Sequence, residues 1–311
     1  MRPGPLSPEG VAQVLELASA AASADGVAPL SEDVLLQVRH GSAAPARDLS
    51  LTAGGASPRD RALVGYAHLD APDYPGQDGD ITAELVIHPA HRRQGYGAFL
   101  LASVLAMADG HGVRLWAHGD LPPAAALAGK SGFTRIRALL QLRMPLAGAP
   151  IADPVFPAGV TVRTFVPGAD EDAWLAVNRR AFAHHLEQGS WTMEDLRLRE
   201  AEPWFDPDGF FLAERDGRVI GFHWTKVHQP DDDAGVPIGE VYVVGVDPRS
   251  QGGGLGRALT VTGLTYLRDR DLADVLLYVD EDNTAAVRMY TALGFGRWST
   301  DVMYRWDAGK R

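Results

Sequence analysis

The chain has 311 residues, of which 46% are hydrophobic and 22% charged, so it can bury the core of one large or two ordinary domains. Its net charge of −11 argues against general nucleic-acid binding, which needs a basic surface. The sequence contains no cysteine, which excludes disulfides, thiolate nucleophiles and cysteine-based metal sites and is consistent with a cytoplasmic protein.

The N-terminal segment is expected to be a helix rather than a leader peptide. Residues 11–22 are moderately apolar, but Gln13 and Glu16 interrupt them and only Arg2 supplies a preceding positive charge. Ser7 and Pro8 stand in the order of an N-cap and a first helical residue. No apolar run reaches the roughly 18 residues that a membrane span needs. We therefore expect a cytoplasmic protein.

The first part of the chain alternates strand-like and helix-like segments. Periodicity and caps predict helices over 7–23, 31–40, the segment after Gly97 to about 108, and 123–130, and strands over 63–69, 82–87, 113–118 and 135–144. Residues 145–159 contain several prolines and show no periodicity, which indicates a linker. We assign a first domain to residues 1–145 and a linker to 146–159.

The same plan restarts in residues 160–311, which we assign to a second domain. The patterns predict strands over 160–165, 210–214, 218–227, 240–246, 275–279 and 298–306, and helices over 169–183, 192–199, 255–269 and 284–293. Gly294 has the position of a left-handed residue that ends the last helix. The expected fold class is α/β with a mixed sheet in each domain.

The stretch from Gly239 to Arg257, GEVYVVGVDPRSQGGGLGR, reads as a buried strand, a turn and a glycine-rich loop that opens a helix. Free backbone N–H groups and the positive end of a helix favour an anion, above all a phosphate. The loop is not a P-loop, because no Gly-Lys-Ser/Thr follows it. Taken alone, such a loop is also compatible with a flexible turn.

A duplication raises the significance of this loop. Pro89 matches Pro248 and Gly95 matches Gly254, each pair 159 residues apart, as do Gly97 and Gly256. A later Gly-Phe pair recurs at a spacing of 162, at residues 132–133 and 294–295. This shared order indicates an internal duplication.

The order of strand, (Gln/Arg)-x-x-Gly-x-Gly loop, helix and a later Asn…Tyr…Gly-Phe helix resembles the GNAT family of acyl-CoA N-acyltransferases. The resemblance implies two tandem GNAT domains, with acetyl-CoA held by the loop amides and along the preceding strand. The residues that it assigns to acetyl-CoA are Val244, Gly245, Val246, Gln251, Gly252, Gly253, Gly254, Leu255, Gly256, Arg257, Asn283, Thr284, Ala285, Ala286, Val287 and Arg288 in the second domain, and Leu85, Val86, Ile87, Arg92, Arg93, Gly95 and Gly97 in the first.

Several longer stretches are similar to the tandem members of this family that acetylate the cysteine amine of a cysteinyl-glucosaminyl-inositol. They include GFHWTKVH, WFDPDG, AFAHHLEQG and LLYVDEDNTAAVRMY in the second half, and DGVAPLSEDVL and AELVIHP in the first. The resemblance implies the same acceptor. It assigns contacts with that acceptor to Glu32, Glu187, Lys226, Glu240 and Tyr278. The charged residues among these are also compatible with solvated surface charges, and Tyr278 with a core position.

Acetyl transfer to an amine requires removal of the amine proton and protonation of the leaving thiolate. Glu240, at the start of the central strand, is the candidate general base, directly or through water; a solvated strand-end charge is the alternative. The resemblance implies that Tyr290 is the general acid, whereas a helical tyrosine is otherwise a packing residue. Asn283 is also a plausible N-cap of that helix. Counting along the first repeat matches Glu240 to Ile81 and Tyr290 to Ala128, so the first domain is expected to bind acetyl-CoA without catalysing.

No metal is expected, because adjacent histidines such as His184 and His185 face apart on a helix and no carboxylate spacing supports a site. Two other functions stay open: acetylation of another amine, such as an aminoglycoside or a protein N-terminus, and acyl-CoA sensing without catalysis. The acidic run 231–233 would suit a cationic acceptor, but such a run is also compatible with a solvated loop. We expect a monomer whose partners are acetyl-CoA and a small amine, with neither nucleic acid nor membrane.

Overall fold

The computed structural model describes residues 2–3, 6–41, 47–54, 62–70, 79–229 and 236–309. Contacts between backbone positions divide the chain into two compact units. Unit 1 contains residues 1–139 and 299–311, and unit 2 contains residues 140–298. These units differ from the two sequence repeats, because the end of the last strand belongs to unit 1. The acidic run 231–233 lies outside the described residues.

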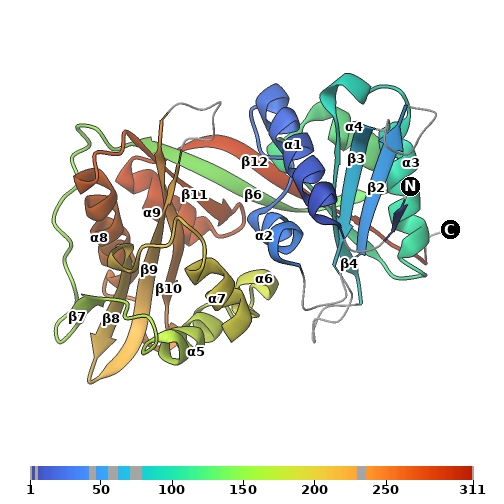
Figure 1. Cartoon of the computed structure of the whole chain (residues 1–311). Coiled ribbons are helices and arrows are strands. Elements are labelled where there is room, and N and C mark those ends of the chain that lie inside the picture. The colour runs from blue at the N-terminus through green and yellow to red at the C-terminus, as the bar shows by residue number, and fades with distance from the viewer. Residues whose placement is uncertain are drawn as a thin grey trace. The chain divides into compact units, whose positions relative to one another are not determined.

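Unit 1 is a mixed sheet with helices on both faces (Figure 1). Its strand order is β1 (Arg2–Pro3), β2 (Arg47–Ala53), β3 (Ala62–Leu69), β4 (Ile81–Ile87), β5 (Val113–Ala117), β12 (Gly296–Trp306) and the start of β6 (Thr134–Pro145). Helices α1 (Pro8–Asp25) and α2 (Glu32–His40) share one apolar cluster with Tyr66 and Val86. Helices α3 (Tyr96–Met107) and α4 (Pro122–Lys130) contribute to the other cluster.

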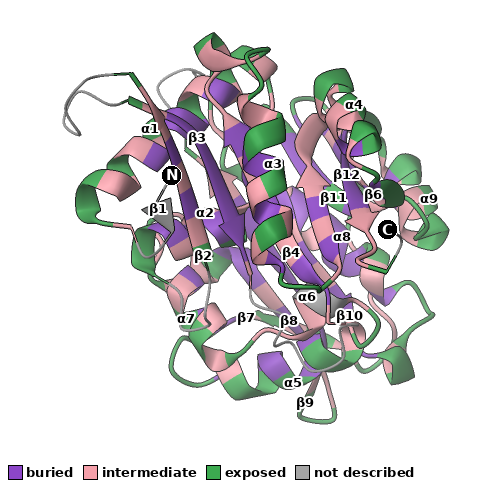
Figure 2. Cartoon of the chain, turned by 90° about the vertical axis from the view of Figure 1, so that its right-hand side faces the viewer, coloured by how far each residue is buried: buried purple, intermediate pink, exposed green. Residues whose placement is uncertain are grey.

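Unit 2 repeats this layered plan. Its strand order is the end of β6, then β11 (Asp274–Asp280), β10 (Ile238–Val246), β9 (Arg218–His228), β8 (Phe210–Arg215) and β7 (Thr161–Thr164). Helices α8 (Leu255–Asp269) and α9 (Thr284–Leu293) pack on one face. Helices α5 (Glu171–Ala181), α6 (Leu186–Gly189) and α7 (Met193–Glu200) lie on the other side of β8–β10 (Figure 1). In Figure 2 the strands are largely buried and the outer helix faces exposed.

The closing strands hold positions that the repeats alone do not reveal. The sequence predicts a last strand for each repeat, and both strands form. β12, from the second repeat, pairs antiparallel with β5, from Val302 opposite Ala117 to Trp306 opposite Val113. β6, from the first repeat, neighbours β11. The sheet of each unit therefore includes a strand segment from the other repeat.

Helix ends follow their predicted caps. The Ser7 hydroxyl accepts from the Gly10 N–H at 3.2 Å and opens α1, and Ser31 does the same for Val34 at 3.3 Å and opens α2. Gly294, with φ of 105°, ends α9 in the left-handed region that glycine tolerates best. No helix in the described part is long and apolar enough to cross a bilayer.

Aromatic rings dominate the α5 side of unit 2. Trp174 of α5 meets the rings of Phe210, Phe222 and Trp224 at centroid distances of 5.3–5.7 Å. Phe210 and Trp224 stack with centroids 4.5 Å apart. All four side chains are fully buried. Large buried rings contribute strongly to core stability, so this cluster fixes α5 against β8 and β9.

The crossing of α8 over β9 gives a test of core packing. A Cβ at Gly263 would overlap the buried ring of His223, so Gly263→Ala is expected to lower the free energy of unfolding by about 1–3 kcal/mol. Gly129→Ala, in α4, is the control, because its Cβ would meet nothing within 4 Å and helical alanine stabilises by about 0.5–1 kcal/mol. Denaturant unfolding measures both. Equal effects would contradict the packing at this crossing.

Candidate active site in unit 2

Strands β10 and β11 run parallel for only a short distance. Their pairing covers Gly239–Val241 opposite Val275–Leu277, and among the described residues it goes no further, although β10 continues to Val246. On its other side β10 stays paired with β9 as far as Val246 opposite Gly221. Backbone groups on the β11 side of residues 242–246 are therefore available to an extended ligand.

A β-bulge precedes this open edge. The β10–β9 register shifts between Val241 and Val243, so Tyr242 is the extra residue. Val243 faces the aromatic cluster of α5, whereas Val241 and Val244 face the cluster of α8 and α9. The bulge thus changes the alternation of side chains where β10 leaves β11.

Gly245 does not form the bulge, although a glycine inside a strand often marks one. The shift falls three residues earlier in β10. A Cβ on Gly245 would come within 2.5 Å of the Phe222 ring and 3.1 Å of the Phe182 ring. Glycine at this position accommodates the packing of these two rings.

The predicted phosphate loop adopts an open, left-handed conformation. Gly252, Gly253 and Gly254 have φ values of 90°, 60° and 84°. Gly254 is the N-cap of α8 and gives no side-chain cap, so the first N–H groups of the helix stay accessible. Leu255 is buried in the core, which leaves only its backbone for a ligand. This geometry suits a diphosphate.

Glu240 is buried, with 5% of its surface exposed, and its carboxylate contacts a histidine side chain. His228 Nε2 lies 2.7 Å from Glu240 Oε2. Opposite Glu240 on β9 is Lys226, whose Nζ lies 4.4 Å from the Trp204 ring centroid and 5.3 Å from that of Tyr242. Directly paired residues share a sheet face, so Glu240 is directed to the α5–α7 side. The sequence analysis missed this histidine contact, because it joins side chains from two different strands.

Tyr290 lies on the other side, in α9, with Val244 in the same apolar cluster. Its ring meets Phe295 edge-on at 5.7 Å. Burial raises the pKa of Tyr290 to about 12, so the hydroxyl keeps its proton at neutral pH. Asn283 is the N-cap of this helix, as predicted, and accepts from the Ala286 N–H at 3.2 Å. The candidate cofactor residues 284–288 form the first turns of α9.

The remaining candidate acceptor contacts are spread over several elements. Tyr278 of β11 is 44% exposed, which excludes the core position that the sequence left open. Its hydroxyl accepts from Gln141 Nε2 of β6 at 2.8 Å. Glu187 belongs to α6, and its side chain lies outside the described part. Glu32 is the first residue of α2 in unit 1 and is half-buried.

Unit 1 contains the same kind of open edge and loop. β4 pairs with β5 only over Ile81–Ala83 among the described residues and then continues to Ile87 through Leu85 and Val86. Arg93 has φ of 62°, and Gly95, the N-cap of α3, has φ of 88°. Gly97 follows in the first turn of α3. The cradle predicted from the duplication thus has its backbone shape in both units.

The Arg92 side chain in unit 1 is held by contacts within the protein. Its two terminal nitrogens bind both carboxylate oxygens of Asp25 at 2.6 and 2.7 Å, and its Nε donates to the Ile87 carbonyl at 3.1 Å. The equivalent Gln251 in unit 2 points its amide at the Val246 carbonyl at 3.5 Å and makes no such ion pair. Arg92 therefore fixes the loop to α1 and does not present a free charge.

The strand register identifies the unit 1 counterparts of the candidate base and acid. Glu240 pairs with Leu276 in unit 2, and Thr82 pairs with Arg114 in unit 1. Residues 114 and 276 are equivalent positions of the two repeats, because they are 162 residues apart, the spacing that also separates the two Gly-Phe pairs. The structural counterpart of Glu240 is therefore Thr82. The sequence-based match to Ile81 was wrong by one residue, because counting cannot detect the bulge at Tyr242. Ala128, the counterpart of Tyr290, is buried and has no hydroxyl group.

Unit 1 does contain a buried carboxylate near its open edge, but that carboxylate is ion-paired. Glu84 accepts from the Ser31 N–H at 2.7 Å and lies 3.5 Å from His118 Nε2. His118 Nδ1 is 3.0 Å from Asp301 of β12. Burial alone would lower the pKa of His118, but its hydrogen bonds to Asp301 and Glu84 raise that pKa to about 10. The arrangement is a closed ion-paired cluster.

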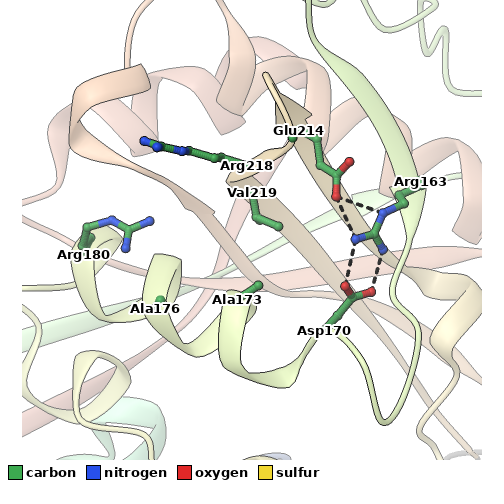
Figure 3. A pocket seen from close by; sticks show the side chains of 9 residues that line it. Arg163, Asp170, Ala173, Ala176, Arg180, Glu214, Arg218 and Val219 are labelled. Carbon is green, nitrogen blue, oxygen red and sulfur yellow. Dashed lines mark hydrogen bonds and ion pairs between the residues drawn. The ribbon is translucent and has the colours of Figure 1, made fainter.

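Two other features do not form a site. A surface cavity of about 420 Å³ lies between α5 and the β8–β9 turn, and none of the residues that line it is a predicted site residue. Its Arg163 is neutralised by Asp170 and Glu214 (Figure 3). No group of three metal-ligating side chains gathers within the described ranges. His223 is fully buried, and burial lowers its pKa to about 4.

Comparison with known proteins agrees with this geometry. Residues 44–133 and 175–295 match the acetyltransferase (GNAT) family. The chain is 59% identical over 292 residues to the mycothiol acetyltransferase of Thermobispora bispora, covering 94% of each chain. It is 58% identical over 296 residues to that of Thermomonospora curvata, covering 95% of this chain and 93% of the relative.

Solved structures share the fold. A tandem GNAT protein from the clavulanic acid biosynthesis pathway superposes with a TM-score of 0.74 at 21% identity, covering 100% of this chain and 99% of the other. A GCN5-related N-acetyltransferase from Sphaerobacter thermophilus gives 0.67 at 23% identity, covering 99% and 95%.

The chain belongs to the GNAT family of acetyltransferases, whose members take their acetyl group from acetyl-CoA. Within that family its similarity over nearly the whole length places it among the mycothiol acetyltransferases.

The Glu240–His228 contact predicts a graded effect of substitution. His228→Leu removes the donor to a buried carboxylate and is expected to lower kcat/KM for the amine about 10-fold. His228→Gln offers an amide donor at this position and should lose less. Initial-rate kinetics on both variants measure this difference. Wild-type rates in both would show that the histidine does not support Glu240.

Proposed function

We propose that the protein acetylates the cysteine amine of 1-D-myo-inositol 2-(L-cysteinylamino)-2-deoxy-α-D-glucopyranoside, the reaction of a mycothiol synthase. The observation that carries the mechanism is the buried Glu240 at the point where β10 leaves β11. A base for the incoming amine and an open strand edge for the acyl donor meet there. The near-full-length similarity to mycothiol acetyltransferases supports this choice of acceptor.

Acetyl-CoA, when bound, supplies the acetyl thioester. The glycine loop from Gln251 to Arg257 would hold its diphosphate through free N–H groups at the start of α8. The backbone of Val244, Gly245 and Val246 would hold its pantetheine arm, because that side of β10 is not paired with β11. The first turns of α9, residues 283–288, would complete the cradle. We propose no metal in the reaction.

Glu240 accepts a proton from the ammonium group of the cysteine, directly or through one water. An α-amino group has an unperturbed pKa of roughly 7.7–8.0, so this base has to remove a proton that is already labile near neutral pH. The amine nitrogen then attacks the carbonyl carbon. His228 orients the carboxylate through its 2.7 Å contact.

Tyr290 assists departure of the thiolate. Because burial raises its pKa to about 12, its O–H remains intact and is able to donate a hydrogen bond and then a proton to sulfur. The C–N bond forms and the C–S bond breaks. The nitrogen loses two protons in total: one leaves through Glu240, and the other replaces the proton that Tyr290 gives to the thiolate. Lys226, Tyr278, Glu187 and, from the first repeat, Glu32 are proposed to bind the acceptor.

Unit 1 is proposed to bind acetyl-CoA without turning it over. Its loop and open edge repeat the cradle, but Thr82 and Ala128 stand where unit 2 has the base and the acid. Glu84 does not replace the base, because it is held by His118 and the Ser31 N–H.

Substitution of the two reacting groups tests the mechanism. Glu240→Gln and Tyr290→Phe are each expected to lower kcat by about 100-fold while leaving acetyl-CoA affinity near wild type, because both act on proton transfer. Release of free CoA with the cysteinyl-glucosaminyl-inositol amine measures the rate, and calorimetry measures acetyl-CoA binding. Full activity in either variant would remove its assigned role.

A matched pair of glycines tests the division of labour. Gly95 and Gly254 both cap helices at φ near 90° (88° and 84°), and a Cβ at either would meet nothing within 4 Å. Replacement by valine should therefore strain both loops similarly. Gly254→Val is expected to abolish turnover, and Gly95→Val to leave it largely intact.

The same assay with melting curves provides the control for folding. A folded Gly95→Val protein that has lost turnover would contradict a non-catalytic role for the unit 1 loop.

A further inference from the structure

Two large aromatic side chains are exposed on the sheet of unit 2. Tyr278 of β11 is 44% exposed and Trp298 of β12 is 62% exposed. They are the two aromatic residues among the exposed large apolar side chains in the described part of unit 2. Two exposed aromatic rings that face the same side of one sheet form a candidate surface for a ligand.

Both rings are fixed by side chains of β6. Gln141, itself 8% exposed, donates to the Tyr278 hydroxyl at 2.8 Å. The Arg143 guanidinium lies over the Trp298 ring at 4.2 Å from its centroid. Arg143 Nε is buried and has no hydrogen-bond partner within the described residues, and the guanidinium group stacks on the indole. A planar guanidinium on one ring face restricts the orientation of the ring.

The two rings extend from the reaction centre. Leu276 pairs with Glu240, and residues two apart on a strand share a face, so Tyr278 lies on the Glu240 side of the sheet. The strand order from β10 through β11 and β6 to β12 then places Trp298 three strand spacings, roughly 14 Å, from β10. This distance between β10 and Trp298 is comparable to the length of an extended amine that is joined to two six-membered rings.

We propose that Trp298, braced by Arg143, and Tyr278, braced by Gln141, form a platform that binds the sugar and inositol rings of the acceptor. This inference rests on the proposed function and deepens it, because it assigns the recognition of the non-reacting part of the acceptor. Hexose and cyclitol rings present apolar C–H faces that pack on an aromatic face. Their hydroxyl edges match the donors of arginine and tyrosine.

The platform combines side chains from both sequence repeats. Gln141 and Arg143 belong to the first sequence repeat, whereas Tyr278 and Trp298 belong to the second. The acceptor surface of unit 2 is therefore incomplete in a single repeat, even though the reacting groups Glu240 and Tyr290 both belong to the second repeat.

Kinetics with two acceptors test the platform. In the full-length protein, Trp298→Ala is expected to raise the KM for the cysteinyl-glucosaminyl-inositol amine about 10-fold while the KM for acetyl-CoA stays near wild type. With cysteinamide, which has the reacting amine and no rings, the variant should match wild type. Trp298→Phe should restore most of the loss, because it keeps an aromatic face.

The neighbouring Arg297→Ala is the matched control. Arg297 is also exposed, precedes Trp298 on the same strand and faces the opposite side. Melting curves verify that each variant folds. Equal losses with both acceptors, or no loss with the ring-containing acceptor, would overturn the platform.

A binding measurement separates the platform from the reaction. Calorimetric titration with glucosaminyl-inositol, which lacks the cysteine, needs no turnover. Wild type is expected to bind it, and Trp298→Ala to bind it about 10-fold more weakly. Absence of binding to wild type overturns the platform. Binding without turnover of the complete acceptor would instead contradict the proposed function and leave the platform standing.

Discussion

The site depends on one backbone event, the separation of β10 from β11 after Val241, next to the bulge at Tyr242. Separation leaves one side of β10 with free peptide groups, which a ligand can use as a partner strand would. The bulge changes the side-chain alternation, so Glu240 is directed to the α5–α7 side while Val244 remains on the side of Tyr290. The base and the acid that we propose can thus approach one acyl group from opposite faces of the sheet.

The same constraint separates the two repeats, although they share a backbone shape. β4 separates from β5 as β10 does from β11, and both loops adopt left-handed glycines. The β3–β4 register, however, runs without a shift from Gly65 opposite Ile87 to Leu69 opposite Ala83. The equivalent of Glu240 is a threonine, and the nearby Glu84 is neutralised by His118. Unit 1 keeps the backbone cradle and lacks the proton-transfer groups.

Most elements were predictable because their signals are local. Ser7, Ser31 and Thr192 cap helices through contacts within three residues, and the glycine loops depend on backbone conformations that glycine tolerates best. The missed features are non-local. β2, with polar residues among its apolar ones, is recognisable as a strand only through its pairing with β3. The bulge carries no glycine, and the partners His228–Glu240 and Gln141–Tyr278 come from different strands.

The placement of β6 and β12 gives a physical reason for the tandem arrangement that is independent of the chemistry of unit 1. An unpaired sheet edge beside β11 or β5 would expose backbone donors and acceptors. Each edge is covered by a strand from the other repeat, and these strands bring side chains that contact it: Gln141 and Arg143 in unit 2, and Asp301, which pairs with His118, in unit 1. The first repeat is therefore needed even though we propose that it does not catalyse, because removing it would remove the strand that contacts Tyr278.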